Sequence, residues 1–174
     1  MKLRSLTIAL AMTGATTGLA AGAAQAADLT ATVEIPRISS ASYHRPYVAI
    51  WIERPDQTAV QTLSVWYQQT ANSEGDGTDW LKDLRTWWRK GGRALNMPVD
   101  GVSGATRAPG RHTVTVSAAR LRGLPAGQYN LVVEAARELG GREVVRVPFR
   151  WGGANTGRAA GTTELGAVTV AVSR

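Results

Sequence analysis

Apolar and polar residues alternate along several parts of the chain, which is the pattern of a half-buried β-strand. The alternation is clearest at residues 29–35 (LTATVEI) and 111–116 (RHTVTV). Residues 47–52 (YVAIWI) are apolar on both faces, which predicts a strand in the centre of a sheet. Further strands are predicted at residues 61–67, 128–135, 143–151 and 164–172. Short strands separated by turn signals favour a mainly β fold, an immunoglobulin-like antiparallel β-sandwich.

One segment has the period of a helix instead. Between residues 78 and 91 (TDWLKDLRTWWRKG) the bulky side chains fall on one helical face: Trp80, Leu84, Trp87 and Trp88. Thr78 or Asp79 can cap the start of this helix, and the Gly91–Gly92 pair can end it. The sequence therefore predicts one short, tryptophan-rich helix within the β domain.

The N-terminal segment follows neither pattern. A basic start at Lys2 and Arg4 precedes an apolar run of small residues, which ends at Ala24-Gln25-Ala26. This order predicts a secretory signal peptide over residues 1–26, and a transmembrane anchor is the alternative. Residues 27–174 then have the length of a single domain. We expect an exported protein, and the style of the signal suggests the bacterial periplasm.

The composition of the chain excludes several kinds of functional site. The chain has no cysteine, which excludes disulfides, iron–sulfur ligation, c-type haem attachment and thiol redox reactions. Its formal net charge of +7 comes mostly from scattered arginines and is compatible with an anionic cofactor or a membrane surface. No nucleic-acid-binding motif is present, so we expect no nucleic-acid partner. His44 and His112 lack the spacing of metal ligands, and Ser103 lacks the Gly-x-Ser-x-Gly context of a hydrolase. Glu134 and Arg137 form a candidate ion pair within the sandwich.

Residues 100–106 (DGVSGAT) concentrate two hydroxyls, Ser103 and Thr106, in a stretch with almost no bulk. Asp-Gly and Ser-Gly are common turn dipeptides, so one interpretation is a plain turn. The other interpretation is a site of attachment, because small residues let a bulky ligand approach the backbone. A threonine hydroxyl is a weak nucleophile, which an external enzyme can activate with a base.

The stretch resembles the flavinylation motif that periplasmic flavin transferases of the ApbE type recognise. The resemblance implies that FMN is joined through its phosphate to the hydroxyl of Thr106. Asp100 corresponds to the leading acid of the motif. Ser103, Gly104 and Ala105 correspond to the small residues before the attachment point.

Three longer segments resemble proteins of the DUF2271 family: residues 87–90 (WWRK), 103–110 (SGATRAPG) and 133–141 (VEAARELGG). Such proteins are exported and are often encoded with PepSY-type membrane redox proteins and the flavin transferase. The resemblance implies an exported flavoprotein electron carrier, which is a substrate of the transferase rather than a stand-alone enzyme. It would pass electrons between a PepSY-type membrane partner and an extracytosolic acceptor. The alternative is a non-catalytic periplasmic binding or scaffold module of the same fold.

Neighbouring residues supply candidate contacts to such a cofactor. Three arginines near the motif are candidates to pair with the phosphodiester, and solvent exposure is the alternative for them: Arg107, Arg111 and Arg93. Trp87 and Trp88 are the nearest candidates for a wall against the isoalloxazine ring, with Trp80 earlier in the helix. A tryptophan pair on a short helix more often packs on a sheet, so the core is the alternative place for both. His112, beside the motif, is a further candidate contact.

Overall fold

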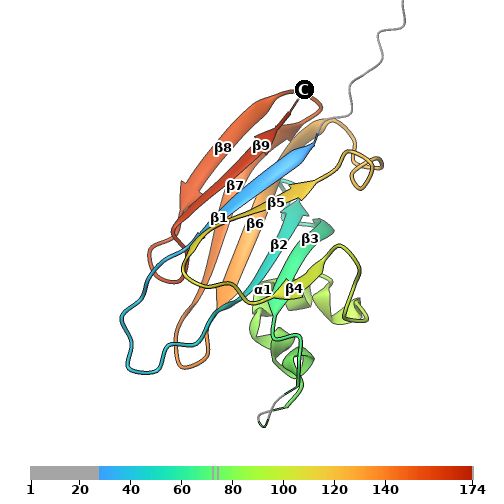
Figure 1. The fold of residues 1–174 in the computed structure, drawn as a ribbon. Coiled ribbons are helices and arrows are strands. Elements are labelled where there is room, and N and C mark those ends of the chain that lie inside the picture. Colours follow the sequence, from blue (N-terminus) through green and yellow to red (C-terminus); the bar gives the residue numbers. More distant parts are fainter. Residues whose placement is uncertain (1–27, 72, 74, 174) are drawn as a thin grey trace, which may run out of the picture.

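Two β-sheets pack face to face in the computed structural model, which describes residues 28–71, 73 and 75–173 (Figure 1). The first sheet consists, in spatial order, of β5 (Gly110–Val116), β1 (Leu29–Ile35), β9 (Ala167–Val172) and β8 (Asn155–Ala160). The second consists of β4 (Ser103–Ala105), β3 (Ala59–Tyr67), β2 (Tyr47–Glu53), β6 (Gly127–Ala136) and β7 (Arg142–Trp151). The predicted mainly β sandwich is confirmed. The predicted signal peptide lies outside the described residues.

The predicted strands all form, and β2 lies in the centre of its sheet as expected. Two strands, β4 and β8, are additional to the prediction. The β4 strand also departs from the expected antiparallel pattern, because it pairs with β3 in parallel. The predicted strand at 164–172 starts late, at Ala167, because the backbone N–H groups of Glu164 and Leu165 donate to the Glu143 carboxylate instead of to a sheet.

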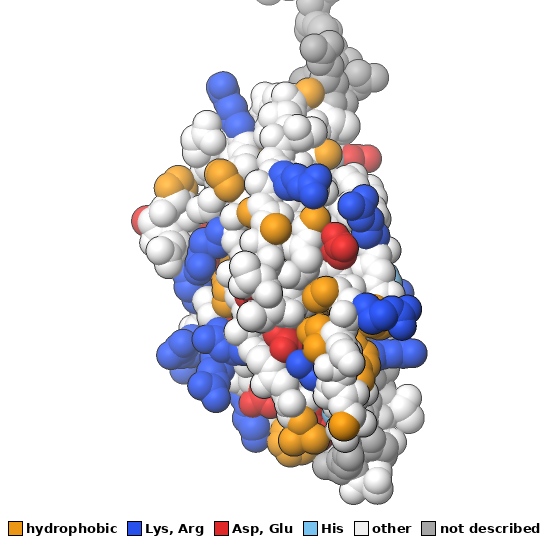
Figure 2. Space-filling model, turned by 90° about the vertical axis from the view of Figure 1, so that its left-hand side faces the viewer, with side chains coloured by type: hydrophobic (Ala, Val, Ile, Leu, Met, Phe, Trp, Pro, Cys, Tyr) orange, Lys and Arg blue, Asp and Glu red, His pale blue; other side chains and the backbone are white. Residues whose placement is uncertain are grey.

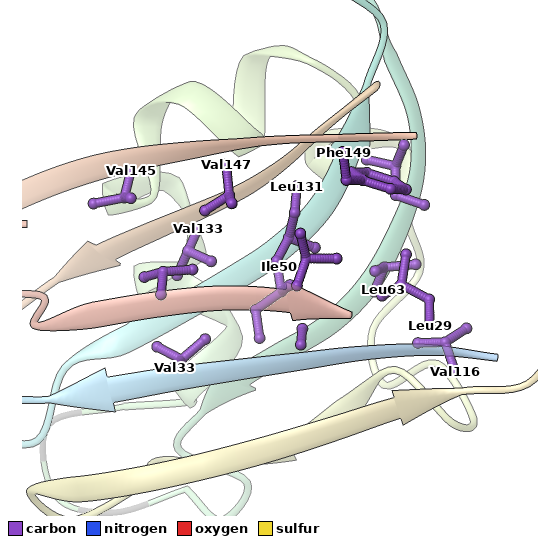
Figure 3. Packing of buried hydrophobic residues seen from close by; sticks show 14 of the residues in the cluster. Leu29, Val33, Ile50, Leu63, Val116, Leu131, Val133, Val145, Val147 and Phe149 are labelled. Carbon is purple, nitrogen blue, oxygen red and sulfur yellow. The ribbon is translucent and has the colours of Figure 1, made fainter. Parts of the chain in front are cut away.

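The main core fills the space between the two sheets. Figure 3 shows side chains from both sheets pointing toward one another, with Leu29 and Val33 of β1 opposite Ile50, Leu131 and Val133 of the second sheet. All of these are fully buried. The alternation along β1 places every second side chain in this core, which is the physical basis of the pattern in the sequence.

A second apolar cluster covers the outer face of the five-stranded sheet. It consists of sheet residues, among them Trp51, Val65 and Tyr67, and of Leu81, Leu84 and Trp87 from the helical segment. Figure 1 shows this segment (green) lying against β2 and β3. Because the segment shields the outer face, β2 is buried on both sides, and its sequence is apolar except for Glu53 at its end. Among the described residues, no helix is long and apolar enough to cross a membrane.

The helical segment is not the single helix that the sequence predicts. It is divided into a 3-10 helix η1 (Gly77–Asp83), the α-helix α1 (Arg85–Arg89) and a 3-10 helix η2 (Gly92–Ala94). The break falls at Leu84, whose ψ of 66° is not helical. This bend allows Leu81, Leu84 and Trp87 all to face the sheet, whereas Trp80 is 44% exposed and does not share their face.

The ends of these pieces also differ from the predicted caps. Asp76 caps η1 by accepting a hydrogen bond from the backbone N–H of Thr78 at 2.8 Å. Lys90 ends α1, and Gly91, with a φ of 143°, begins η2 instead of ending a long helix. Gly92 lies against the Trp87 ring, because a Cβ there would be 2.6 Å from the ring carbons. The close contact fixes where the chain turns.

Two buried carboxylates from the sheet hold the helical segment in place. Glu134 of β6 accepts hydrogen bonds from the backbone N–H groups of Thr86 at 3.0 Å and Trp87 at 2.8 Å, and it pairs with Arg142 at 2.7 Å. It does not pair with Arg137, contrary to the prediction, because residues three apart on a strand face opposite sides of the sheet. The second carboxylate, Glu53, binds the Trp51 indole, Lys90 and Arg146.

Candidate functional site

The first half of the DGVSGAT stretch is a closed turn. The backbone N–H of Ser103 donates to the carbonyl of Val99 at 2.9 Å, and the Ser103 hydroxyl accepts from the Val99 N–H at 2.8 Å. Gly101 has a φ of 68°, which favours glycine at this corner. Asp100 is exposed on the turn. The turn interpretation is therefore correct for this half, and the Ser103 hydroxyl serves the turn.

The second half is the short edge strand β4. Its residues pair in parallel with the end of β3, with Ser103 opposite Val65 and Ala105 opposite Tyr67. The pairing begins at Val102, whose carbonyl accepts from the Val65 N–H at 2.8 Å. Gly104 lies on the indole of Trp66, where a Cβ would be 3.4 Å from the ring. The small residues of the stretch thus let the backbone lie flat on the sheet edge.

Thr106 follows this strand and begins the crossing from the five-stranded sheet to β5 of the other sheet. The residue is partly exposed. Within the described part of the chain, no hydrogen bond occupies its hydroxyl. Ser103 and Thr106 therefore differ: the first hydroxyl is engaged in the turn, and the second is available for chemistry.

An open hollow of about 1040 Å³ lies beside Thr106. It lies at one end of the second sheet, where β2 and β7 start and where β3, β4 and β6 finish. We call it the strand-end hollow. Its walls come from five places: Thr106, Gln68, the 43–47 segment, Trp80 with Asp83 and Arg85, and residues 136–142.

The strand-end hollow has an aromatic and basic lining. Four arginines and two acids contribute to it, with Tyr43, Tyr47 and Trp80. Figure 2 shows one face of the molecule, on which Lys and Arg side chains (blue) lie in several separate groups. Of the four arginines, Arg137 and Arg142 pair with the buried carboxylates of Glu164 and Glu134. An open, partly aromatic hollow that also holds Arg45 and Arg85 can accept an aromatic ligand with an anionic group.

Two polar atoms of the hollow are buried and have no hydrogen-bond partner among the described residues. They are the Nη1 atom of Arg137 and the hydroxyl oxygen of Tyr43. The Arg137 side chain is 7% exposed, and its Nε and Nη2 atoms bind both carboxylate oxygens of Glu164 at 2.8 and 3.0 Å. The hydrogen bond to Glu164 raises the pKa of Arg137, so the guanidinium is charged at any physiological pH.

The arginines predicted to pair with a phosphodiester lie outside the lining of the hollow. Arg107 is exposed, and its guanidinium lies over the Trp66 ring at 5.4 Å. Arg111 is 3.9 Å from a carboxylate oxygen of Glu34 and is 70% exposed. Arg93 is exposed within η2. Of the three, Arg107 stays closest in sequence to the predicted attachment point.

The aromatic candidates separate into two groups. Trp87 is 2% exposed, packs on the sheet and donates its indole N–H to Thr62 at 3.0 Å, so it takes the core position given as its alternative. Trp88 packs partly buried against the same cluster. Trp80 lines the strand-end hollow with Thr106. His112 of β5 contacts the Trp66 ring edge to face at 5.7 Å.

Sequence reasoning missed Tyr43 and Arg137, which lie 63 and 31 residues from Thr106 along the chain. No motif joins them to DGVSGAT, and only the fold brings them to one hollow, at the same end of the sheet.

Comparison with curated proteins and with solved structures finds no match. The profile of a family described as "Predicted periplasmic protein (DUF2271)" matches residues 28–167. The chain therefore belongs to the DUF2271 family of predicted periplasmic proteins.

Proposed function

We propose that this chain is an exported flavoprotein electron carrier, with FMN joined covalently through its phosphate to Thr106. The observation that carries the proposal is the environment of Thr106 within the DGVSGAT stretch. Its hydroxyl has no hydrogen-bond partner among the described residues, and it opens onto a hollow large enough for a ligand of this size. A domain that only serves as a scaffold needs neither feature at this position.

The attachment step balances with FAD as the donor. The Oγ atom of Thr106 forms a bond to the phosphorus of the FMN half, and the bond between that phosphorus and the bridging oxygen of the pyrophosphate breaks. AMP leaves, and the hydroxyl proton passes to a base of the ApbE-type transferase. The metal of the transferase activates the phosphate. This chain contributes the accessible hydroxyl and small neighbours, Gly104 and Ala105, that leave room for the approaching enzyme.

The residues present are compatible with the product. The phosphodiester keeps one negative charge, which Arg107 next to the attachment point, or Arg45 and Arg85 in the hollow, can neutralise. FMN supplies the electron-accepting and electron-donating chemistry when bound. The protein tethers the group and sets its surroundings. A covalent tether also prevents loss of the cofactor by diffusion outside the cytoplasm.

The proposed partners follow from this role. A PepSY-type membrane redox protein would donate electrons to the carrier, and an extracytosolic acceptor would remove them. The carrier needs an exposed route to both partners, and the open strand-end hollow provides one at an end of the sheet.

Intact mass of the exported protein, co-produced with a flavin transferase, tests the proposal. We expect a gain equal to FMN less one water, mapped to the peptide that contains Thr106. Thr106→Ala should lose the gain, and Thr106→Ser should keep it, because only the hydroxyl is required. An unmodified wild-type mass, with a transferase active on another acceptor, would overturn the proposal and favour the binding or scaffold module.

A further inference from the structure

We propose that the strand-end hollow is the docking site of the isoalloxazine ring, with Trp80 as its stacking wall and Arg137 and Tyr43 as hydrogen-bond donors at its inner end. The inference rests on the proposed attachment of FMN to Thr106 and adds the place, the contacts and the electronic tuning of the ring. Three independent observations carry it: the shared hollow, an exposed tryptophan, and two unpartnered donors.

Trp80 is more exposed than the other bulky side chains of the predicted helix. Its neighbours Leu81 and Leu84 are buried on the sheet, whereas Trp80 is 44% exposed on the side of the hollow. A large aromatic surface left in water at the edge of a ligand-sized hollow is a stacking surface for another flat ring. Lys82 lies over the same indole at 5.4 Å and adds positive charge nearby.

The inner end of the hollow holds donors without acceptors. Arg137 uses Nε and Nη2 on Glu164, which leaves Nη1 as the single unused arm of a buried guanidinium. Tyr43 lies beside it, with its ring 5.7 Å from the Arg137 Cζ atom. Burial raises the pKa of Tyr43, so its hydroxyl stays protonated and can donate at neutral pH. The carbonyl oxygens at the polar edge of a flavin ring are acceptors of the matching kind.

Both donor atoms are covered in this conformation, and the cover over Arg137 is the 138–141 turn. Gly140 lies directly on the guanidinium, since a Cβ there would be 2.3 Å from Cζ. At the tip of the turn, Leu139 is 78% exposed and has a φ of 52°, which is unfavourable for leucine. Docking therefore includes a small opening of this exposed turn.

The placement has an electronic consequence. The reduced ring is more negative than the oxidised ring, and a fixed guanidinium at its polar edge favours the reduced form. Glu164 pairs with the other two arms of this guanidinium and offsets its charge, so the effect rests on the hydrogen bonds that Arg137 and Tyr43 would donate to the reduced ring. We expect the docked flavin to have a higher midpoint potential than the same flavin on an unfolded chain.

Native and denatured samples of the flavin-loaded protein separate docking from attachment. Attachment is read from the mass and from flavin fluorescence after denaturation, and docking from the fall in fluorescence in the native protein. We expect Trp80→Ala to recover native fluorescence several-fold, because the stacking indole is removed. Tyr43→Phe should keep the quenching and lower the midpoint potential by about 30 mV for each tenfold loss of preference for the reduced form.

Tyr129→Phe is the matched control. It removes the hydroxyl that donates to the Pro125 carbonyl, on a tyrosine whose ring packs in the main core and does not line the hollow, and it should change neither signal. The docking proposal is overturned if Trp80→Ala and Tyr43→Phe both match the wild type at equal attachment. A missing mass gain would instead overturn the attachment at Thr106, so the two failures are distinguishable.

Discussion

Replacing Glu143 with glutamine should remove a pH-dependent part of the stability of this domain. The Glu143 carboxylate, at the start of β7, accepts hydrogen bonds from four backbone N–H groups, those of residues 162–165 in the turn between β8 and β9, at 2.7 to 3.1 Å. That turn carries Glu164, which in turn holds Arg137 at the strand-end hollow. The carboxylate therefore supports both the fold and the position of the guanidinium.

The magnitude follows from the pKa of this carboxyl. Burial raises the pKa of Glu143, but the four N–H groups lower it more, so the net change is from 4.5 to about 2. At about 1.4 kcal/mol per pH unit, this difference sets an upper limit of about 3 kcal/mol. The side chain is partly exposed, and screening by water reduces the contribution to about 1–2 kcal/mol.

The sign of the pH dependence is fixed by the lowered pKa. Because the folded state binds the proton more weakly than the unfolded state, the contribution is complete above the unfolded pKa and disappears as the pH falls toward 2. Urea unfolding of wild type and Glu143→Gln should differ by about 1–2 kcal/mol at about pH 7, and the gap should close by about pH 2. Other carboxyls titrate in both proteins and cancel in the comparison. A gap that stays constant with pH would refute the assignment of this pKa to the turn.

Two further substitutions test the packing around the sheets. Glu134→Ala should lower the free energy of unfolding by about 3 kcal/mol, because it removes the partner of Arg142 and the acceptor for the first N–H groups of α1; equal urea midpoints would contradict this. Gly157→Ala should lower the free energy of unfolding by about 2 kcal/mol, because its Cβ would lie 2.4 Å from the Pro148 carbonyl oxygen. Gly153→Ala is the control: its Cβ meets open space, and the melting temperature should stay nearly unchanged. Equal melting temperatures for these two glycine variants would show that β8 shifts freely away from β7.

The strands were predictable because their signal is local. In β1 every second residue enters the core, and in β2 both faces are covered, so the patterns of residues 29–35 and 47–52 follow directly from burial. The β4 strand has three small residues and no apolar pattern, and it is a strand only because the end of β3 lies beside it. Long-range pairing of this kind leaves no mark on the paired sequence.

The prediction of a single helix over residues 78–91 failed for a related reason. Periodicity alone joins residues 78–91 into one helix, but the chain bends at Leu84, and Leu81, Leu84 and Trp87 all pack on the sheet beneath. The bend is what turns Trp80 away from Trp87 and toward Thr106. The difference between Trp87 in the core and Trp80 in the lining of the hollow therefore depended on the sheet and not on the spacing.

Arg137 shows most clearly why part of the candidate site could not be predicted from the sequence. Its nearest acid along the strand, Glu134, faces the helical segment, and its real partner, Glu164, comes from a turn that Glu143 holds. Two buried donors, on Arg137 and Tyr43, have no acceptor among the described residues, and a buried donor that stays unpaired costs about 1–3 kcal/mol in general. Both residues line the same hollow as Thr106, and this coincidence is what supports our proposal of a tethered, acceptor-bearing ring over that of a plain scaffold.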